Sequence, residues 1–320
     1  MSRFKKLSAG VFVLSAVASP LVAHACSSCG CTLSSDWASQ GYAAGEGLRL
    51  DLRLDYFNQD QLRASTHSVN RKSISFPADQ EVQQSTLNRN YTLTLDYSPN
   101  ADWGFNVQIP YFNRFHTTIA EGDTAISASH TDSMGDMRLA VRYQGFSQDH
   151  TTGVQVSVKF ATGSFDNTFF SGPQAGNLLD RGLQPGTGTT DLIVGLYNFG
   201  TLGRDWDYFA QGFVQQPLNS RDGFRPGTGL NVNVGIRYVA LKAITPQLQI
   251  NVRAEKRESG DEADIENSGA TLAYLSPGVT ANLSHHVRAY GFVQVPLYQR
   301  VNGLQVEPRY TASLGLHYAF

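Results

Sequence analysis

The stretch GLRLDLRLDYF, residues 47–57, alternates apolar and charged side chains without interruption. The two alternating sets are Leu48, Leu50, Leu52 and Leu54, and Arg49, Asp51, Arg53 and Asp55. A period of two residues predicts a β-strand with one apolar and one charged face. The leucines then face either the core of a soluble domain or a lipid bilayer. In the second case protein encloses the charged side chains.

The two ends of the chain favour the bilayer. Residues 1–25 combine a basic head, an apolar stretch over residues 7–22 and a small-x-small site at Ala23–Ala25, which predicts a secretory signal peptide. The apolar stretch is too short for a membrane-spanning helix, which needs roughly 20 residues. At the other end, YTASLGLHYAF (310–320) ends on Phe320 and resembles the C-terminal signature that the barrel-assembly machinery of bacterial outer membranes reads. The last strand of a soluble domain is the alternative.

The two-residue period recurs in segments of about ten residues, which is the length of a barrel strand. The twelve segments are 47–58, 88–98, 102–115, 135–145, 152–162, 190–199, 205–218, 229–240, 246–257, 270–283, 287–299 and 308–320. Aromatic side chains stand at strand ends, where membrane interfaces would fall. They are Tyr56, Phe57, Tyr97, Trp103, Tyr143, Trp206, Tyr208 and Tyr238.

Connections alternate between short and long. The short ones are 98–101, 147–151, 201–204, 243–245 and 284–286, and the long ones are 59–87, 116–134, 163–189, 219–228 and 258–269, with a short last outer loop at 301–304. We therefore expect an all-β fold: a transmembrane antiparallel β-barrel of about 12 strands over residues 47–320, with short periplasmic turns and long extracellular loops. Both termini are then periplasmic, in the outer membrane of a Gram-negative bacterium. A soluble β-sandwich is the alternative, and it would need one aliphatic core across twelve strands.

The barrel interpretation places a polar set of side chains in the lumen. They are Arg49, Asp51, Arg53, Asp55, Asp96, Gln108, Arg138, Arg142, Lys159, Asp207, Gln215, Arg237, Arg253, Glu255, Arg288 and Gln294. These side chains either fill the barrel as a ladder of ion pairs or line a path for a small-molecule solute. Twelve strands lie between the filled eight-stranded barrels and the water-filled porins.

A Val-Gln-x-Pro pattern occurs three times, at residues 107–110, 214–217 and 293–296. Pro110, Pro217 and Pro296 cannot donate a ladder hydrogen bond, so each predicts a bulge or kink. Phe209, Phe213, Tyr290 and Phe292 are also expected to point inward and to form an apolar patch. Such a patch suits a hydrophobic or aromatic solute, although an old hairpin repeat would explain the pattern equally.

The segment LQPGTGTTDLIVGLYN (183–198) resembles the Gly-Thr/Ser-Gly-x-x-Asp-x-x-x-Gly segment of an outer-membrane family named for the meta-pathway of phenol degradation. The matching positions are Gly186, Gly188, Asp191 and Gly195. The resemblance implies a transporter-like barrel whose substrate is unproven, and it brings no catalytic residues. The segment lacks the lysine of a phosphate-binding loop and precedes a strand.

All three cysteines lie in CSSCGC, at Cys26, Cys29 and Cys31, in a periplasmic segment predicted over residues 26–46. A disulfide suits that compartment but leaves one thiol over. Lipid on Cys26 and a Cu or Zn ion bound by the thiolates are the two alternatives. The following residues predict a short helix from Ser35 or Asp36 that could plug the periplasmic mouth.

Other function classes find little support in the sequence. Net charge is −2 and no basic stripe is present, so we expect no nucleic-acid partner. No Ser-His-Asp order, His-Glu-x-x-His motif or pair of carboxylates can be placed together, so we expect no enzyme and no resident cofactor. The sequence predicts a channel for a small solute, or alternatively a non-conducting barrel that anchors the cysteine segment for metal handling or redox partnering.

Overall fold

The structure is a computed structural model that describes residues 40–41 and 45–320. The predicted signal peptide, the cluster of Cys26, Cys29 and Cys31, and the helix predicted from Ser35 or Asp36 lie outside the described residues. These remain predictions from the sequence.

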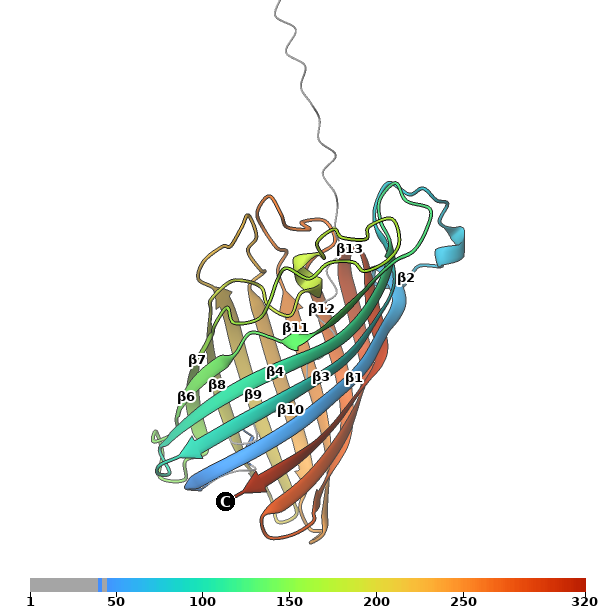
Figure 1. Ribbon diagram of the computed structural model, residues 1–320. Helices are drawn as coiled ribbons and strands as arrows, with labels where there is room; N and C mark the ends of the chain where they lie inside the picture. The colour runs from blue at the N-terminus through green and yellow to red at the C-terminus, as the bar shows by residue number, and fades with distance from the viewer. Residues whose placement is uncertain (1–39, 42–44) are drawn as a thin grey trace, which may run out of the picture.

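Antiparallel strands form a closed barrel in which strands that are neighbours in sequence are neighbours in the wall (Figure 1). In the described part of the chain the wall strands are β1 (Gly47–Ser65), β3 (Val82–Ser98), β4 (Trp103–Ile119), β6 (Arg138–Tyr143), β7 (Thr152–Lys159), β8 (Asp191–Leu202), β9 (Trp206–Pro217), β10 (Gly229–Tyr238), β11 (Ile244–Glu255), β12 (Ala270–Asn282) and β13 (Val287–Ala319). Pairing of β13 with β1 closes the ring. The predicted all-β transmembrane barrel is confirmed.

Four short elements lie outside this ring. They are β2 (His67–Ser68), the 3₁₀ turns η1 (Arg71–Ser73) and η2 (Arg181–Leu183), and β5 (Ser127–Met134), which is off the main strand order but extends the wall by pairing with β4. No helix within residues 40–41 and 45–320 has the length and apolar character needed to cross a membrane.

Twelve crossings make up the wall over residues 45–320. Strand β13 counts twice, because its residues 288–301 pair with β12 and its residues 301–319 pair with β1. The chain reverses between these arms near Gly303, whose φ of +55° is a left-handed conformation that favours glycine. Strands β5 and β6 share one crossing, because β5 pairs with residues 111–118 of β4 and β6 with residues 103–108.

In residues 47–57 the apolar side chains face outward and the charged side chains face inward, as expected for a membrane barrel. Leu52 is 49% exposed on the outer wall, whereas Asp51 and Arg53, its neighbours along β1, are 3% and 9% exposed. Most other large apolar side chains of the strands, such as Leu139 and Ile250, are also exposed. The apolar face is therefore the outside of the cylinder, which is the reverse of a soluble sandwich.

One residue of the predicted aromatic belt was assigned to the wrong face. Tyr56 is on the outside, but the next residue, Phe57, is 3% exposed and faces the interior, because successive residues of a strand point to opposite faces. At the short-turn end the outward aromatics pair across strands, with centroid distances of 4.8 Å for Trp103 and Tyr143 and 5.0 Å for Trp206 and Tyr238.

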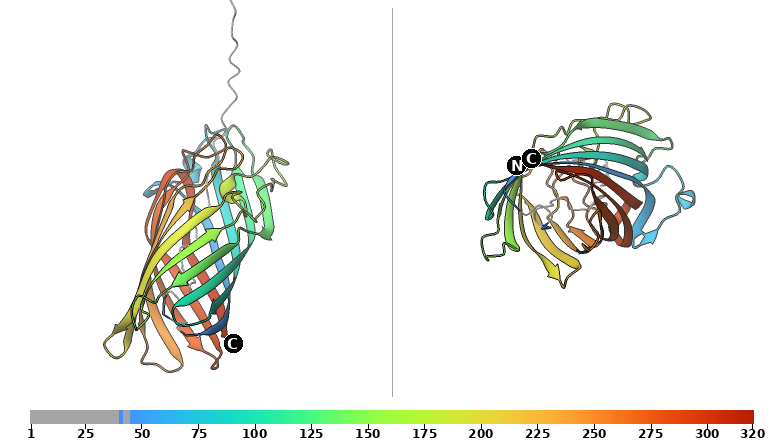
Figure 2. Two further views of the ribbon diagram at one scale, coloured as in Figure 1. Left: turned by 90° about the vertical axis from the view of Figure 1, so that its left-hand side faces the viewer. Right: turned by 90° about the horizontal axis from the view of Figure 1, so that it is seen from below.

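The first two long loops are shorter than predicted, since strands continue into them. Strand β1 runs to Ser65 and β3 begins at Val82, inside the predicted loop 59–87. A small apolar cluster of Leu62, Val82, Leu304 and Val306 packs there and stabilises the extra strand. Likewise β4 runs to Ile119 and β5 takes up the last eight residues of the predicted loop 116–134, so this part of the wall stands taller than the rest (Figures 1 and 2).

The three Val-Gln-x-Pro prolines have three different outcomes. Pro110 lies where the partner of β4 changes from β6 to β5, and its carbonyl accepts from Gly135 N at 2.9 Å. Pro296 lies beside a register shift between β12 and β13, as predicted. Pro217 is instead the last residue of β9, so it ends the strand rather than bending it.

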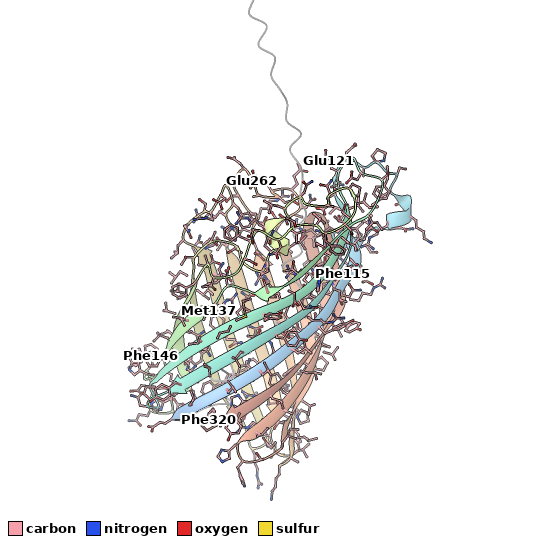
Figure 3. All side chains as sticks on the ribbon, in the orientation of Figure 1. Phe115, Glu121, Met137, Phe146, Glu262 and Phe320 are labelled. Atoms are coloured by element: carbon pink, nitrogen blue, oxygen red, sulfur yellow. The ribbon has the colours of Figure 1, made fainter. Side chains whose placement is uncertain are left out.

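Short turns and long loops lie at opposite ends of the barrel. Figure 3 shows Phe146 and the C-terminal Phe320 at the short-turn end, and Glu121 and Glu262 at the long-loop end. Strand β1 starts at the short-turn end too, since Arg49 pairs with Ala319. The start of the first strand and the end of the last strand therefore lie next to each other at the short-turn end of the barrel.

Candidate functional site: the barrel lumen

Near the short-turn end, two arginines of the inner wall share one carboxylate. Asp96 of β3 accepts from Arg49 of β1 at 3.1 and 2.6 Å, and from Arg142 of β6 at 2.9 and 3.2 Å. Ser98 Oγ accepts from both guanidinium groups as well, at 2.5 and 3.2 Å. All three charged side chains are buried, so charge pairing and hydrogen bonds together offset the cost of desolvation.

Further ion pairs lie on the inner wall. Arg53 Nε is 2.9 Å from Asp55, and Arg253 lies 2.8 Å from Glu255. Lys159 Nζ lies 2.8 Å from Asp136 and 3.3 Å from Asp191. The sequence placed these residues on the inner face of the barrel, but only the structure shows which of them form ion pairs.

The remaining predicted lumen residues are spread along the inner wall. Tyr290 donates to Asp51 at 2.9 Å, and Gln294, which is fully buried, donates to Ser276 at 3.2 Å. Gln108 and Gln215 line the cavity described below. Asp207 and Arg288 are half-buried near the strand ends at the short turns.

A piece of the N-terminal segment reaches the inner wall. The Arg237 guanidinium donates to the carbonyl of Gln40 and lies 5.2 Å from the centroid of the Phe209 ring. Gln40 is 1% exposed, and Gly41 lies so close to Phe199 that a Cβ there would stand 2.5 Å from a ring carbon. Residues 40–41 therefore occupy part of the lumen at the short-turn end.

A cavity of about 400 Å³ occupies the other half of the lumen, beneath the long loops. Polar residues of β1, β3, β4, β6 and β7 line it together with the aromatic side chains Phe57, Phe112, Phe213 and Phe224. The aromatic side chains could contact an apolar part of a small molecule, and the polar ones could fix its orientation.

The loop between β7 and β8 folds inward and forms part of the cavity wall. Arg114 of β4 donates to the carbonyls of Gly182 and Leu183, at 3.3 and 2.7 Å. Thr187 donates through its backbone to Asp136 at 3.0 Å and accepts from Lys159. The loop is therefore tied to the inner wall at both η2 and the Gly-Thr-Gly segment.

The spacing of the glycines and Asp191 in residues 186–195 has a steric explanation. Gly186 lies against the backbone of Gly163, where a Cβ would stand 2.3 Å from a carbonyl oxygen. Gly188 has a φ of +72°, and Asp191 then starts β8 fully buried on the inner wall. The expected return of this loop into a strand is thus observed.

Glycines opposite inward aromatics are the feature that the sequence analysis missed. A Cβ on Gly195 would stand 2.0 Å from Phe213, its cross-strand partner, and the ring therefore lies flat against the wall. The same arrangement pairs Gly153 with Tyr197, Gly235 with Phe209, and Gly278 with Phe292. The lumen stays wider than the aromatic content of its wall suggests.

Buried carboxyl groups gather in the long loops above the cavity. Burial raises the pKa of Asp264 to about 7, and repulsion from Glu81 contributes. Burial also raises the pKa of Asp180 well above its ordinary range, with further repulsion from Glu258, Asp264 and Glu81. His116 on β4 faces Glu81 at 3.9 Å. Burial and mutual repulsion thus favour the protonated form of Asp180 and Asp264.

Within residues 40–41 and 45–320 no group of three His, Cys, Asp or Glu side chains is placed to hold a metal ion. The metal site suggested for Cys26, Cys29 and Cys31 lies outside the described residues and stays a prediction.

No family model matches the sequence, and no curated protein matches it either. Among solved structures, an outer-membrane channel from Pseudomonas putida F1 superposes with a TM-score of 0.64, at 13% identity, over 90% of this chain and 99% of that one. The CymD monoaromatic hydrocarbon channel gives 0.46 at 9% identity over 86% and 89%. The toluene transporter TodX of Pseudomonas putida gives 0.44 at 9% over 94% and 98%.

At such identities the similarity concerns the fold alone. The resemblance of residues 183–198 to the phenol-degradation family stays an expectation. This chain has the fold of an outer-membrane channel barrel.

Proposed function

We propose that the protein is an outer-membrane channel that binds and passes a small solute with an aromatic or other hydrophobic part. The observation that carries the proposal is the cavity of about 400 Å³ inside the barrel, lined by buried ion pairs and by phenylalanines. A lumen filled completely by its ion-pair ladder would leave no such space. The aromatic side chains lie flat on glycines and leave the cavity open to a planar guest.

The outer wall supports the membrane location. Exposed aliphatic residues form its face, whereas Arg or Lys there would cost roughly 2–4 kcal/mol at the bilayer midplane. In this proposal the short turns and both chain ends are periplasmic, and the long loops face the outside. Phe320, 68% exposed beside Tyr318, is then available to the assembly machinery.

Single-channel recording of the purified barrel in a planar bilayer tests the proposal. Wild type is expected to give stepwise currents. Ser157→Trp places an indole in the cavity and should reduce them strongly, because Ser157 lines the cavity. Val156→Trp is the matched control, since the neighbouring residue is 45% exposed on the outer wall.

A wild-type barrel that stays silent in lipid would contradict the proposal, as would equal currents in the two tryptophan variants. Folding of each variant is checked by the shift in gel mobility between unheated and boiled samples.

A further inference from the structure

Arg138 of β6 stands out among the cations of the cavity. Over the described residues it makes no hydrogen bond and no ion pair, although it lines the cavity. Each of the other cations there has partners. Arg53 and Arg253 each form an ion pair with one carboxylate, and Lys159 forms ion pairs with two. Arg114 and Arg181 donate hydrogen bonds to backbone carbonyls.

The nearby carboxylates are already engaged. Asp136 accepts from Gly163 N through Oδ1 at 3.0 Å, and from Lys159 and Thr187 through Oδ2. Asp191 accepts from Thr189 at 2.9 Å and from Gln215 at 2.5 Å. Among the described residues, neither carboxylate makes a direct hydrogen bond or ion pair with Arg138.

Charged side chains of both signs surround Arg138. Its cross-strand partner on β7 is Lys159, and like charges in that position destabilise a sheet. Arg253 and Arg53 are near enough to repel it, and Asp191 and Asp136 are near enough to attract it. Six cationic and five carboxylate side chains line the cavity. A guanidinium held without a partner among other cations leaves five donors for an anion from outside the chain.

Apolar surface lies on the same cavity wall. Phe112 lies flat over Gly135, where a Cβ would stand 2.3 Å from the ring, and Phe213 lies flat over Gly195. Both rings and Pro110 line the cavity with Arg138. An anionic group and a planar apolar group can therefore be bound at once.

We propose that Arg138 binds the carboxylate of a small aromatic acid whose ring contacts this phenylalanine-lined wall. The proposal rests on the solute-channel function and narrows its solute class to aryl carboxylates. A carboxylate matches the two-pronged donor geometry of a guanidinium, and such pairs are among the stronger hydrogen-bonded contacts in proteins. The ring adds burial of apolar area.

Calorimetric titration of the purified full-length barrel in detergent tests this site. The probes are benzoate, its neutral counterpart benzamide, acetate as a carboxylate without a ring, and inorganic phosphate. Wild type is expected to bind benzoate at least about tenfold more tightly than the other three, since each probe lacks one half of the recognition.

Arg138→Gln should weaken benzoate binding about tenfold or more and leave benzamide unchanged, and Arg138→Lys should fall between the two. The matched control is Arg300→Gln, because Arg300 is exposed on β13, away from the cavity. Equal benzoate affinity in wild type and Arg138→Gln would overturn the proposal. Acetate or phosphate binding as tight as benzoate would also overturn it, because the site would then be a general anion site.

Conductance separates this inference from the proposed function. A barrel that binds benzoate through Arg138 but never conducts would refute the channel and leave the site standing. A barrel that conducts with no preference for benzoate would refute the site alone. The reversal potential of wild type across a salt gradient is a second measurement that needs no variant: anion preference is expected, and cation preference would count against the site.

Discussion

Arg142 on β6 reaches across the whole width of β4 to bind Asp96 on β3, with nitrogen–oxygen distances of 2.9 and 3.2 Å. The side chain can cross because Gly104 is its cross-strand partner on β4. A Cβ on Gly104 would stand 2.2 Å from a guanidinium nitrogen. The ion pair thus depends on a residue that carries no charge.

Asp96→Asn is expected to destabilise the barrel strongly. The change removes the carboxylate that Arg49 and Arg142 share, and breaking a buried pair costs about 3–5 kcal/mol. The free energy of unfolding in lipid vesicles, from urea titration, measures the effect. Asp261→Asn, at an exposed loop position, is the control. A loss below about 1 kcal/mol, the value of an exposed pair, would show that solvent screens this cluster.

Gly195→Ala should narrow the cavity without removing any side chain. The new methyl group would stand 2.0 Å from Phe213 and must push the ring into the lumen, so single-channel conductance falls. Gly212→Ala on β9 is the matched control, because its Cβ would find no atom nearer than 3.9 Å. Conductance that falls equally in both variants would rule out the steric explanation.

The long loops should loosen as pH rises. Burial raises the pKa of Asp264 to about 7 and that of Asp180 well above its ordinary value, so the folded loops bind these protons more tightly than the unfolded chain does. Stability is therefore greatest below the ordinary aspartate pKa of about 4 and falls as pH rises toward 7.

Amide hydrogen exchange of residues 256–269, corrected for the intrinsic rate, measures this loosening. Protection should fall between about pH 4 and pH 7 in wild type, as the linkage relation requires. Asp264→Asn should flatten most of the change, and Asp261→Asn should not. An unchanged pH profile in Asp264→Asn would mean that other groups hold the loops.

Gly41→Val should release residues 40–41 from the inner wall and raise the conductance. The added side chain meets the Phe199 ring at 2.5 Å, and the φ of +76° is unfavourable for valine. Gly45→Val is the control, because Gly45 also has a positive φ but a Cβ there would find no atom within 4 Å. If the two variants conduct alike, the contact with Phe199 does not restrict the lumen.

Much of the fold could be predicted because strand alternation is a local property. Leu52 and Arg53 differ by one position, and that alone assigns them to opposite faces. Both the number of crossings and the sense of the apolar face followed from this period. Strand ends were less accurate: the cluster around Leu62 and Val306, which extends β1, joins residues more than 200 positions apart.

The candidate site could be predicted only as a set of inward residues. Arg138 and Arg142 are four positions apart on the same face of β6, and nothing in the sequence distinguishes them. Arg142 finds Asp96 because β4 offers a glycine in between, while Arg138 meets Lys159 and carboxylates that are already engaged.

The sequence by itself determined, through the alternation of its side chains, that this chain forms a cylinder with an apolar outside and a charged inside. It could do so because successive side chains of a strand point to opposite faces, which is a local property of the chain. Only the tertiary structure decided which charges meet, which arginine of the cavity has no hydrogen bond or ion pair among the described residues, and where space remains. Those outcomes depend on register across several strands and on a loop that folds back into the lumen, and both are set by residues far apart in sequence.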